Sequence, residues 1–179
     1  MKLNIGAGNT RYDEFLNCDY SDIFNPDFQF NIETDLWPFK DDSVDEVIAN
    51  HVLEHIGEGF FHCIKELYRV CANDAIIRIQ VPHYLSENMY HDPTHRRPIT
   101  PRTFVLMDKE YNRNDTGASS KLGLHLNVDF VVIDENLEIN ENHPLHERLE
   151  KMNKDQLYSY AYDKVNIFSN QNITLKVRK

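Results

Sequence analysis

The chain has 179 residues, of which 41% are hydrophobic and 27% charged, and its formal net charge is −10. This composition is typical of a globular protein, and we expect residues 1–179 to form a single domain. The negative charge disfavours binding to long nucleic acid, and no apolar run approaches the roughly 18 residues that a membrane span needs. The chain lacks a signal-peptide pattern at its start, and its three cysteines have no CxxC spacing. We therefore expect reduced thiols in a cytoplasmic protein.

Strand-like segments recur along the chain with helical or loop segments between them. The expected strands cover residues 2–5, 15–18, 28–32, 44–49, 75–81, 128–134 and 173–177. Apolar residues repeating on one face predict a helix over 60–71, and Pro101 and Pro144 indicate two further helix starts. This alternation predicts an α/β fold with a Rossmann-like, doubly wound and mostly parallel seven-stranded sheet.

The first expected strand ends in a glycine loop, Gly6-Ala7-Gly8, and the carboxylate of Asp19 ends the next one. Glycines let a ligand approach the backbone, and an acidic residue at the following strand end can hold a ribose. The dinucleotide fingerprint needs a third glycine and an acidic residue about 20 residues further on. Asp19 follows Gly8 by only eleven residues, which disfavours NAD. An ordinary strand-end turn is the alternative explanation for the glycines alone.

Polar residues follow several of the other expected strands. In open α/β sheets, ligands bind beyond the carboxyl ends of the strands. Besides Gly6, Gly8 and Asp19, this rule selects Asp35, Asn50, His51, Pro82 and His83.

The sequence resembles the class I S-adenosylmethionine-dependent methyltransferases, and in particular their small, type 11-like branch. The resemblance rests on residues 3–8, 16–19, 35–39, 41–45 and 51–56, and further along on 91–95 and 100–104. It covers roughly residues 2–108. It implies S-adenosyl-L-methionine as the cofactor and methyl transfer as the reaction, and we expect a small-molecule acceptor. The usual N-terminal helices over the cofactor are expected to be missing, because the first strand begins at residue 2.

The resemblance also implies roles for individual residues. Gly6, Ala7 and Gly8 would lie under the methionine and ribose portions of the cofactor, and Asp19 would bind the ribose hydroxyls. Asp35 and Leu36 would lie beside the adenine. His51 would lie beside the sulfonium and its methyl group. We expect no metal ion to be needed for this reaction.

Histidines supply the candidate catalytic groups. His51 and His83 are the candidates for a general base, because imidazole titrates near neutral pH. Nearby, Arg96 and Arg97 are candidates for recognising an anionic group on the acceptor.

Two other functions stay open. One is a non-catalytic module of the same fold that works through a protein partner or as a homo-oligomer. The other is a metal-dependent enzyme that uses His83, His91 and His95, whose clustering with Asp92 suits zinc or iron. Prolines around these histidines also fit a rigid turn in which the imidazoles bond to the backbone.

Overall fold

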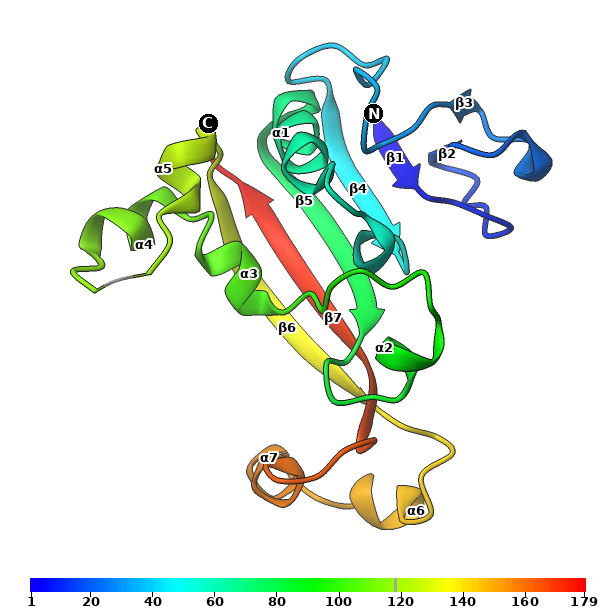
Figure 1. Cartoon of the computed structure of the whole chain (residues 1–179), viewed down its shortest axis with the longest axis vertical. Coiled ribbons are helices and arrows are strands. Elements are labelled where there is room, and N and C mark those ends of the chain that lie inside the picture. The colour runs from blue at the N-terminus through cyan, green and yellow to red at the C-terminus, as the bar shows by residue number, and fades with distance from the viewer. Residues whose placement is uncertain (118) are drawn as a thin grey trace.

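The computed structural model describes residues 1–117 and 119–179, which form a seven-stranded sheet in the order β3-β2-β1-β4-β5-β7-β6 (Figure 1). The strands are β1 (Lys2–Ile5), β2 (Leu16–Asp19), β3 (Phe28–Gln29), β4 (Val44–Asn50), β5 (Cys71–Pro82), β6 (Phe130–Ile139) and β7 (Phe168–Val177). Strands β1 to β5 pair in parallel, and β7 pairs antiparallel with both β5 and β6. The prediction of a Rossmann-like, mostly parallel seven-stranded sheet is confirmed.

Short helices join these strands. They are η1 (Asp22–Phe24), η2 (Leu53–His55), α1 (Phe60–Val70), α2 (Asn88–His91), α3 (Pro101–Val105), α4 (Lys109–Asn114), α5 (Leu122–Leu126), α6 (His146–Leu149) and α7 (Lys154–Ala161). Thr100 caps α3 through reciprocal bonds with Thr103, as the Thr-Pro pair predicts. The helix expected from Pro144 begins at His146 and lasts one turn, and α7 follows as a separate helix. In the described part of the chain, no helix is both long and apolar enough to cross a membrane.

The central strands bury one face and leave the other more open. In β7, Ile173, Leu175 and Val177 are buried, while the residues between them are partly exposed. Strand β5 shows the same alternation, with Ile77 and Ile79 buried on either side of the exposed Arg78. Figure 1 shows α1 lying over β4 and β5 and α3 over β6 and β7, all on one face. This period of two is typical of a sheet with one solvated face.

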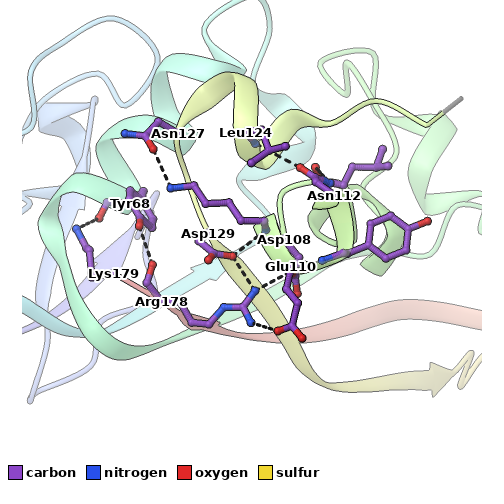
Figure 2. A network of polar contacts seen from close by, with 12 residues as sticks. Tyr68, Asp108, Glu110, Asn112, Leu124, Asn127, Asp129, Arg178 and Lys179 are labelled. Atoms are coloured by element: carbon purple, nitrogen blue, oxygen red, sulfur yellow. Dashed lines mark hydrogen bonds and ion pairs between the residues drawn. The ribbon is translucent and has the colours of Figure 1, made fainter. Parts of the chain in front are cut away.

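An ion network fixes the end of the chain to the helical layer (Figure 2). The guanidinium of Arg178 pairs with Asp108 at 2.6 Å, and with Glu110 and Asp129 at 2.9 Å each. The hydroxyl of Tyr68 on α1 donates to the backbone oxygen of Arg178 at 2.6 Å. These carboxylates, Asp129 first, raise the pKa of Arg178 above its usual range. The network therefore joins α1, α4 and the entry into β6 at one point.

Candidate cofactor and catalytic site

A cavity of about 700 Å³ lies beyond the carboxyl ends of β1, β2, β3 and β4. Its wall includes Gly6, Asp19, Phe30, Asn31, Glu33, His51 and His55. The volume falls within the range of about 300–1,000 Å³ that is typical of small-molecule and cofactor sites. Three of the residues expected at a cofactor site, Gly6, Asp19 and His51, therefore share one cavity.

The two glycines of the loop after β1 differ in their surroundings. Both have a positive φ, 61° for Gly6 and 49° for Gly8, a conformation that residues with a Cβ rarely adopt. A Cβ built on Gly6 would lie 2.7 Å from the Cβ of Val52. The Val52 side chain therefore requires glycine at position 6. A Cβ built on Gly8 meets no atom of the described residues within 4 Å. Gly8 therefore presents open backbone, whereas Gly6 is held by packing.

Asp19 is fixed by its neighbours in an orientation that suits a diol. Its Oδ2 accepts from the backbone N–H of Gly8 at 2.9 Å, and its Oδ1 accepts from that of Ser21 at 2.9 Å. The residue is only 6% exposed, yet it lines the cavity. Each carboxylate oxygen has a second lone pair that can accept another hydrogen bond. The carboxylate can therefore bind two hydroxyl groups side by side.

Asp35 and Leu36, expected beside the adenine, lie outside the lining of this cavity. Asp35 accepts from the backbone N–H of Asn31 at 2.8 Å and from the Thr34 hydroxyl at 3.0 Å, and these bonds lower its pKa. Leu36 is 74% exposed. The lining comes instead from Phe30 to Glu33, because β3 ends at Gln29. The rule that ligands bind beyond the carboxyl ends of strands selects these residues once β3 is taken to end at Gln29 instead of the expected residue 32.

Glu33 ties this wall to α1. Its Oε2 accepts from the backbone N–H groups of Gly57 at 3.0 Å and Gly59 at 3.2 Å. Gly59 is the N-cap residue of α1, where the helix dipole favours an anion. A Cβ on Gly59 would contact the backbone of Glu33, with 2.8 Å to its Cα, so glycine permits this close approach. Sequence reasoning missed Glu33, although it stands four residues past β3.

His51 turns the chain sharply at the end of β4. Its φ is 52°, which is uncommon for a residue with a side chain and costs about 1–3 kcal/mol. Its backbone N–H donates to the oxygen of Gln80 at 2.8 Å, so the turn is anchored to β5. The imidazole is 44% exposed, and its Nδ1 lies 3.4 Å from Oε1 of the buried Glu54. Glu54 is the main cause of a raised pKa at His51; burial opposes it, and Gln80 and Glu138 add smaller contributions that raise the pKa.

Comparisons with known proteins agree with this arrangement. Residues 17–79 match the family model described as the methyltransferase domain. This stretch of the chain is therefore similar to a methyltransferase domain. No curated protein matches the sequence significantly.

Several solved structures share this fold at low sequence identity. A SAM-dependent methyltransferase from Archaeoglobus fulgidus is 18% identical, with a TM-score of 0.60 over 98% of this chain and 85% of that one. A putative S-adenosylmethionine-dependent methyltransferase from Listeria monocytogenes is 15% identical, with a TM-score of 0.55 over 99% of this chain and 90% of that one. A putative methyltransferase in complex with the Haloferax volcanii Trm112 activator is 12% identical, with a TM-score of 0.56 over 99% and 82%.

The residues that line the cavity fit S-adenosylmethionine, the cofactor expected from the sequence. The fixed Asp19 carboxylate suits a ribose diol, and the open backbone at Gly8 leaves room beside it. Phe30 and Ile32 add apolar surface to the same cavity. This combination of a diol acceptor, exposed backbone and apolar wall matches the parts of a nucleoside.

His83, the second candidate base, lies in a different cavity of the domain. That cavity measures about 270 Å³ and is lined by His83, Tyr84, Tyr158 and Phe168, among others. The imidazole is buried against Tyr84 and Phe168, with ring centroids 4.4 and 5.3 Å away, and burial lowers its pKa. The structure does not bring His51 and His83 to one cavity, because antiparallel β7 places Phe168 against the residue that follows β5.

The predicted histidine trio also separates. His83 lies in the smaller cavity, and His91 is exposed, with its Nδ1 3.3 Å from the oxygen of Glu87. His95 instead meets Glu54 and His55, two residues that sequence reasoning had not grouped with it. Their signal is the His51-x-x-Glu54-His55 pattern directly after β4. The trio of His83, His91 and His95 was therefore wrong as a ligand set.

The two arginines have different positions in the domain. Arg96 is exposed and lines the larger cavity, where it can meet an anionic group. Arg97 donates through Nε to the oxygen of Ile56 at 3.3 Å, and its guanidinium lies 4.6 Å from the Phe60 ring centroid. Arg97 is thus occupied in holding the loop after α2 against η2 and α1.

Proposed function

We propose that this chain transfers the methyl group of S-adenosylmethionine to a small-molecule acceptor. The observation that carries the proposal is the Asp19 carboxylate, fixed by Gly8 and Ser21 in the same cavity as Gly6 and His51. The cavity volume of about 700 Å³ supports a small acceptor beside the cofactor. Three cysteines that are buried and free support a reducing compartment such as the cytoplasm.

Positioning is the main task of the protein in this reaction. When bound, the cofactor would supply an electrophilic methyl group, which the acceptor would take by in-line displacement while the neutral thioether departs. Holding the two reactants in line lowers the barrier, because the entropy of alignment is lost on binding. Asp19 and the glycine loop orient the cofactor. His51, at the end of β4 and facing the same cavity, contacts the acceptor, and its anchored turn keeps the imidazole in place.

Isothermal titration with S-adenosylmethionine and with its demethylated product tests the cofactor site. We expect both to bind the purified chain, and Asp19→Ala to weaken binding by roughly 10–100-fold, since charge-assisted hydrogen bonds contribute about 1.5–3 kcal/mol. Asp13→Ala is the matched control, because Asp13 is an exposed carboxylate outside the cavity.

The outcomes separate the hypotheses. Equal binding by the Asp19→Ala variant would contradict the role of that carboxylate. If neither ligand binds at millimolar concentration, the non-catalytic alternative becomes the better explanation. A methyl-transfer assay with a tritiated methyl group then identifies the acceptor among candidate small molecules.

A further inference from the structure

Glu54, His55 and His95 form a group of three hydrogen-bond acceptors at the edge of the cavity. One ligand atom from each side chain lies within 4.8 Å of the other two. Glu54 is fully buried, and within residues 1–117 and 119–179 neither of its carboxylate oxygens has a hydrogen-bond partner. The 3.4 Å contact from Oε1 to His51 lacks hydrogen-bond geometry, and Oε2 is left without even that contact. A buried carboxylate without a partner is costly, so this group requires an explanation.

The hydrogen bonds around His95 fix which of its nitrogens carries the proton. Its Nδ1 lies 2.9 Å from the backbone oxygen of Met89. A carbonyl oxygen can only accept, so Nδ1 carries the hydrogen. In the neutral imidazole the other nitrogen, Nε2, then holds a lone pair.

A short relay fixes His55 in the same tautomer. The Thr94 hydroxyl donates its single hydrogen to Oδ1 of Asp92 at 2.6 Å. It must then accept from Nδ1 of His55, which lies 2.8 Å away. Nε2 of His55 is again the nitrogen with the lone pair. Metal-binding histidines are commonly oriented in this way, with the second ring nitrogen donating to a carbonyl or to a group held by a carboxylate.

Backbone contacts hold the group together. Glu54 and His55 belong to η2, and His95 comes from the loop after α2. The N–H of Arg96 donates to the oxygen of Glu54 at 2.7 Å, which fixes that loop against η2. The two imidazole centroids are 4.6 Å apart with their planes at 67°, so the rings converge without stacking.

We propose that Glu54, His55 and His95 bind a divalent transition-metal ion, with zinc as the best fit. Two imidazole nitrogens and one carboxylate oxygen are a zinc ligand set that leaves a fourth position open. A cation also satisfies three facing acceptors at once. His55 and Thr94 line the larger cavity, so the ion would lie at its wall. This ligand set shares no residue with Asp19 and the glycine loop, although both border the same cavity, and the proposal does not depend on methyl transfer.

Zinc titration of the full-length chain, after removal of metal with EDTA, tests the site. We expect one equivalent of ZnCl₂ to bind at micromolar concentration or below, and CoCl₂ to give a visible absorption band. His55→Ala and His95→Ala should each weaken zinc binding by at least about 100-fold. Thr94→Val removes only the group that orients His55 and should weaken binding by roughly 10–100-fold. His91→Ala is the matched control, a nearby exposed histidine outside the group, and should leave binding unchanged.

Several results would overturn the proposal. One is the absence of zinc binding at micromolar concentration, which would leave the group holding only a proton. Another is an equal loss of zinc affinity in the His91→Ala and His95→Ala variants. Should the alanine variants lose their circular dichroism spectrum, Thr94→Val decides the matter, and unchanged affinity there also refutes the site. Cofactor titration of the EDTA-treated protein distinguishes failure here from failure of the proposed methyl transfer.

Discussion

Replacing Glu66 with alanine should destabilise the protein, because this side chain fastens the segment after β3 to α1. Oε2 of Glu66 accepts from the backbone N–H of Trp37 at 2.8 Å. The carboxylate also accepts two bonds from Arg69, through Nε at 2.8 Å and Nη2 at 2.7 Å. Arg69 in turn donates to the backbone oxygens of Trp37 and Phe39 at 3.0 and 2.9 Å. The variant would leave the Trp37 N–H unpaired and lose both bonds to Arg69.

The size of the effect follows from burial. The Glu66 side chain is 9% exposed, and that of Arg69 is 25% exposed. Breaking a fully buried pair costs about 3–5 kcal/mol, and hydrogen bonds to charged groups contribute about 1.5–3 kcal/mol. Partial exposure of Arg69 places the loss near the lower values, at about 2–3 kcal/mol. In a chain of this length such a loss lowers the melting temperature by about 4–12 °C.

The pH dependence has a defined sign. Arg69, through its hydrogen bonds, lowers the pKa of Glu66 below its usual value of 4.5 in the folded state. The carboxylate therefore contributes its stability above pH 4.5, and this contribution is lost as the pH falls through the lower folded pKa.

Urea unfolding followed by circular dichroism measures this change, with Glu141→Ala as the control, because Glu141 is exposed. Surface substitutions of that kind stay within about 0.5 kcal/mol. The double variant Glu66→Ala/Arg69→Ala should lose less than the sum of the single losses, since the two side chains share bonds. If Glu66→Ala unfolds like Glu141→Ala, the attributed role is wrong.

Two further expectations concern buried groups. Burial raises the pKa of Cys18 and Cys71 to about 12 and that of Cys63 further still. A thiol reagent at pH 8 should therefore modify none of the three thiols in the folded protein and all three in urea. Rapid labelling of the folded protein would refute their burial. Burial lowers the folded pKa of His83 below its usual 6.5, so the free energy of unfolding should fall as the pH drops from 6.5 through that lower value. His83→Asn should reduce this fall between pH 7 and 5, and an identical pH dependence in urea unfolding would contradict the assignment.

Much of the sheet follows from local sequence patterns. The runs at 2–5 and 44–49 became β1 and β4 with changes of at most one residue, because apolar residues recur there within a few positions. The ends of β5, β6 and β7 extend beyond the predicted segments. Their added residues pair across strands, as Asn136 does with Asn172, and such long-range pairing leaves no periodic signal of its own.

The sequence predicted those residues of the candidate site that lie at the carboxyl ends of strands, and it predicted the others less well. Gly6, Asp19 and His51 meet in the cavity because parallel strands place their carboxyl ends at one edge. Asp35 lies outside the lining of this cavity because β3 has only two residues, and propensity cannot delimit so short a strand. The contact of Glu54 and His55 with His95 joins residues 40 positions apart. Spacing within 83–95 could not reveal it, since the partner loop is set by tertiary packing.

The two glycines should respond differently to alanine, because only one of them faces a side chain. Both positions have a positive φ, so either substitution costs about 1–2 kcal/mol of backbone strain. Gly6→Ala also forces Val52 aside, and overpacking of this kind adds about 1–3 kcal/mol. Urea unfolding should therefore rank Gly6→Ala below Gly8→Ala in stability, and Gly6→Ala/Val52→Ala should recover part of the difference.

Cofactor titration of these glycine variants separates packing from ligand contact. Gly8→Ala places a methyl group in the open space beside Asp19, so it should weaken S-adenosylmethionine binding while the fold keeps most of its stability. Val52 immediately precedes η2, which carries Glu54 and His55, so the displacement in Gly6→Ala should also reach that group. Equal stability of the two alanine variants would show that Val52 yields without cost. The glycine requirement at position 6 would then come from φ alone.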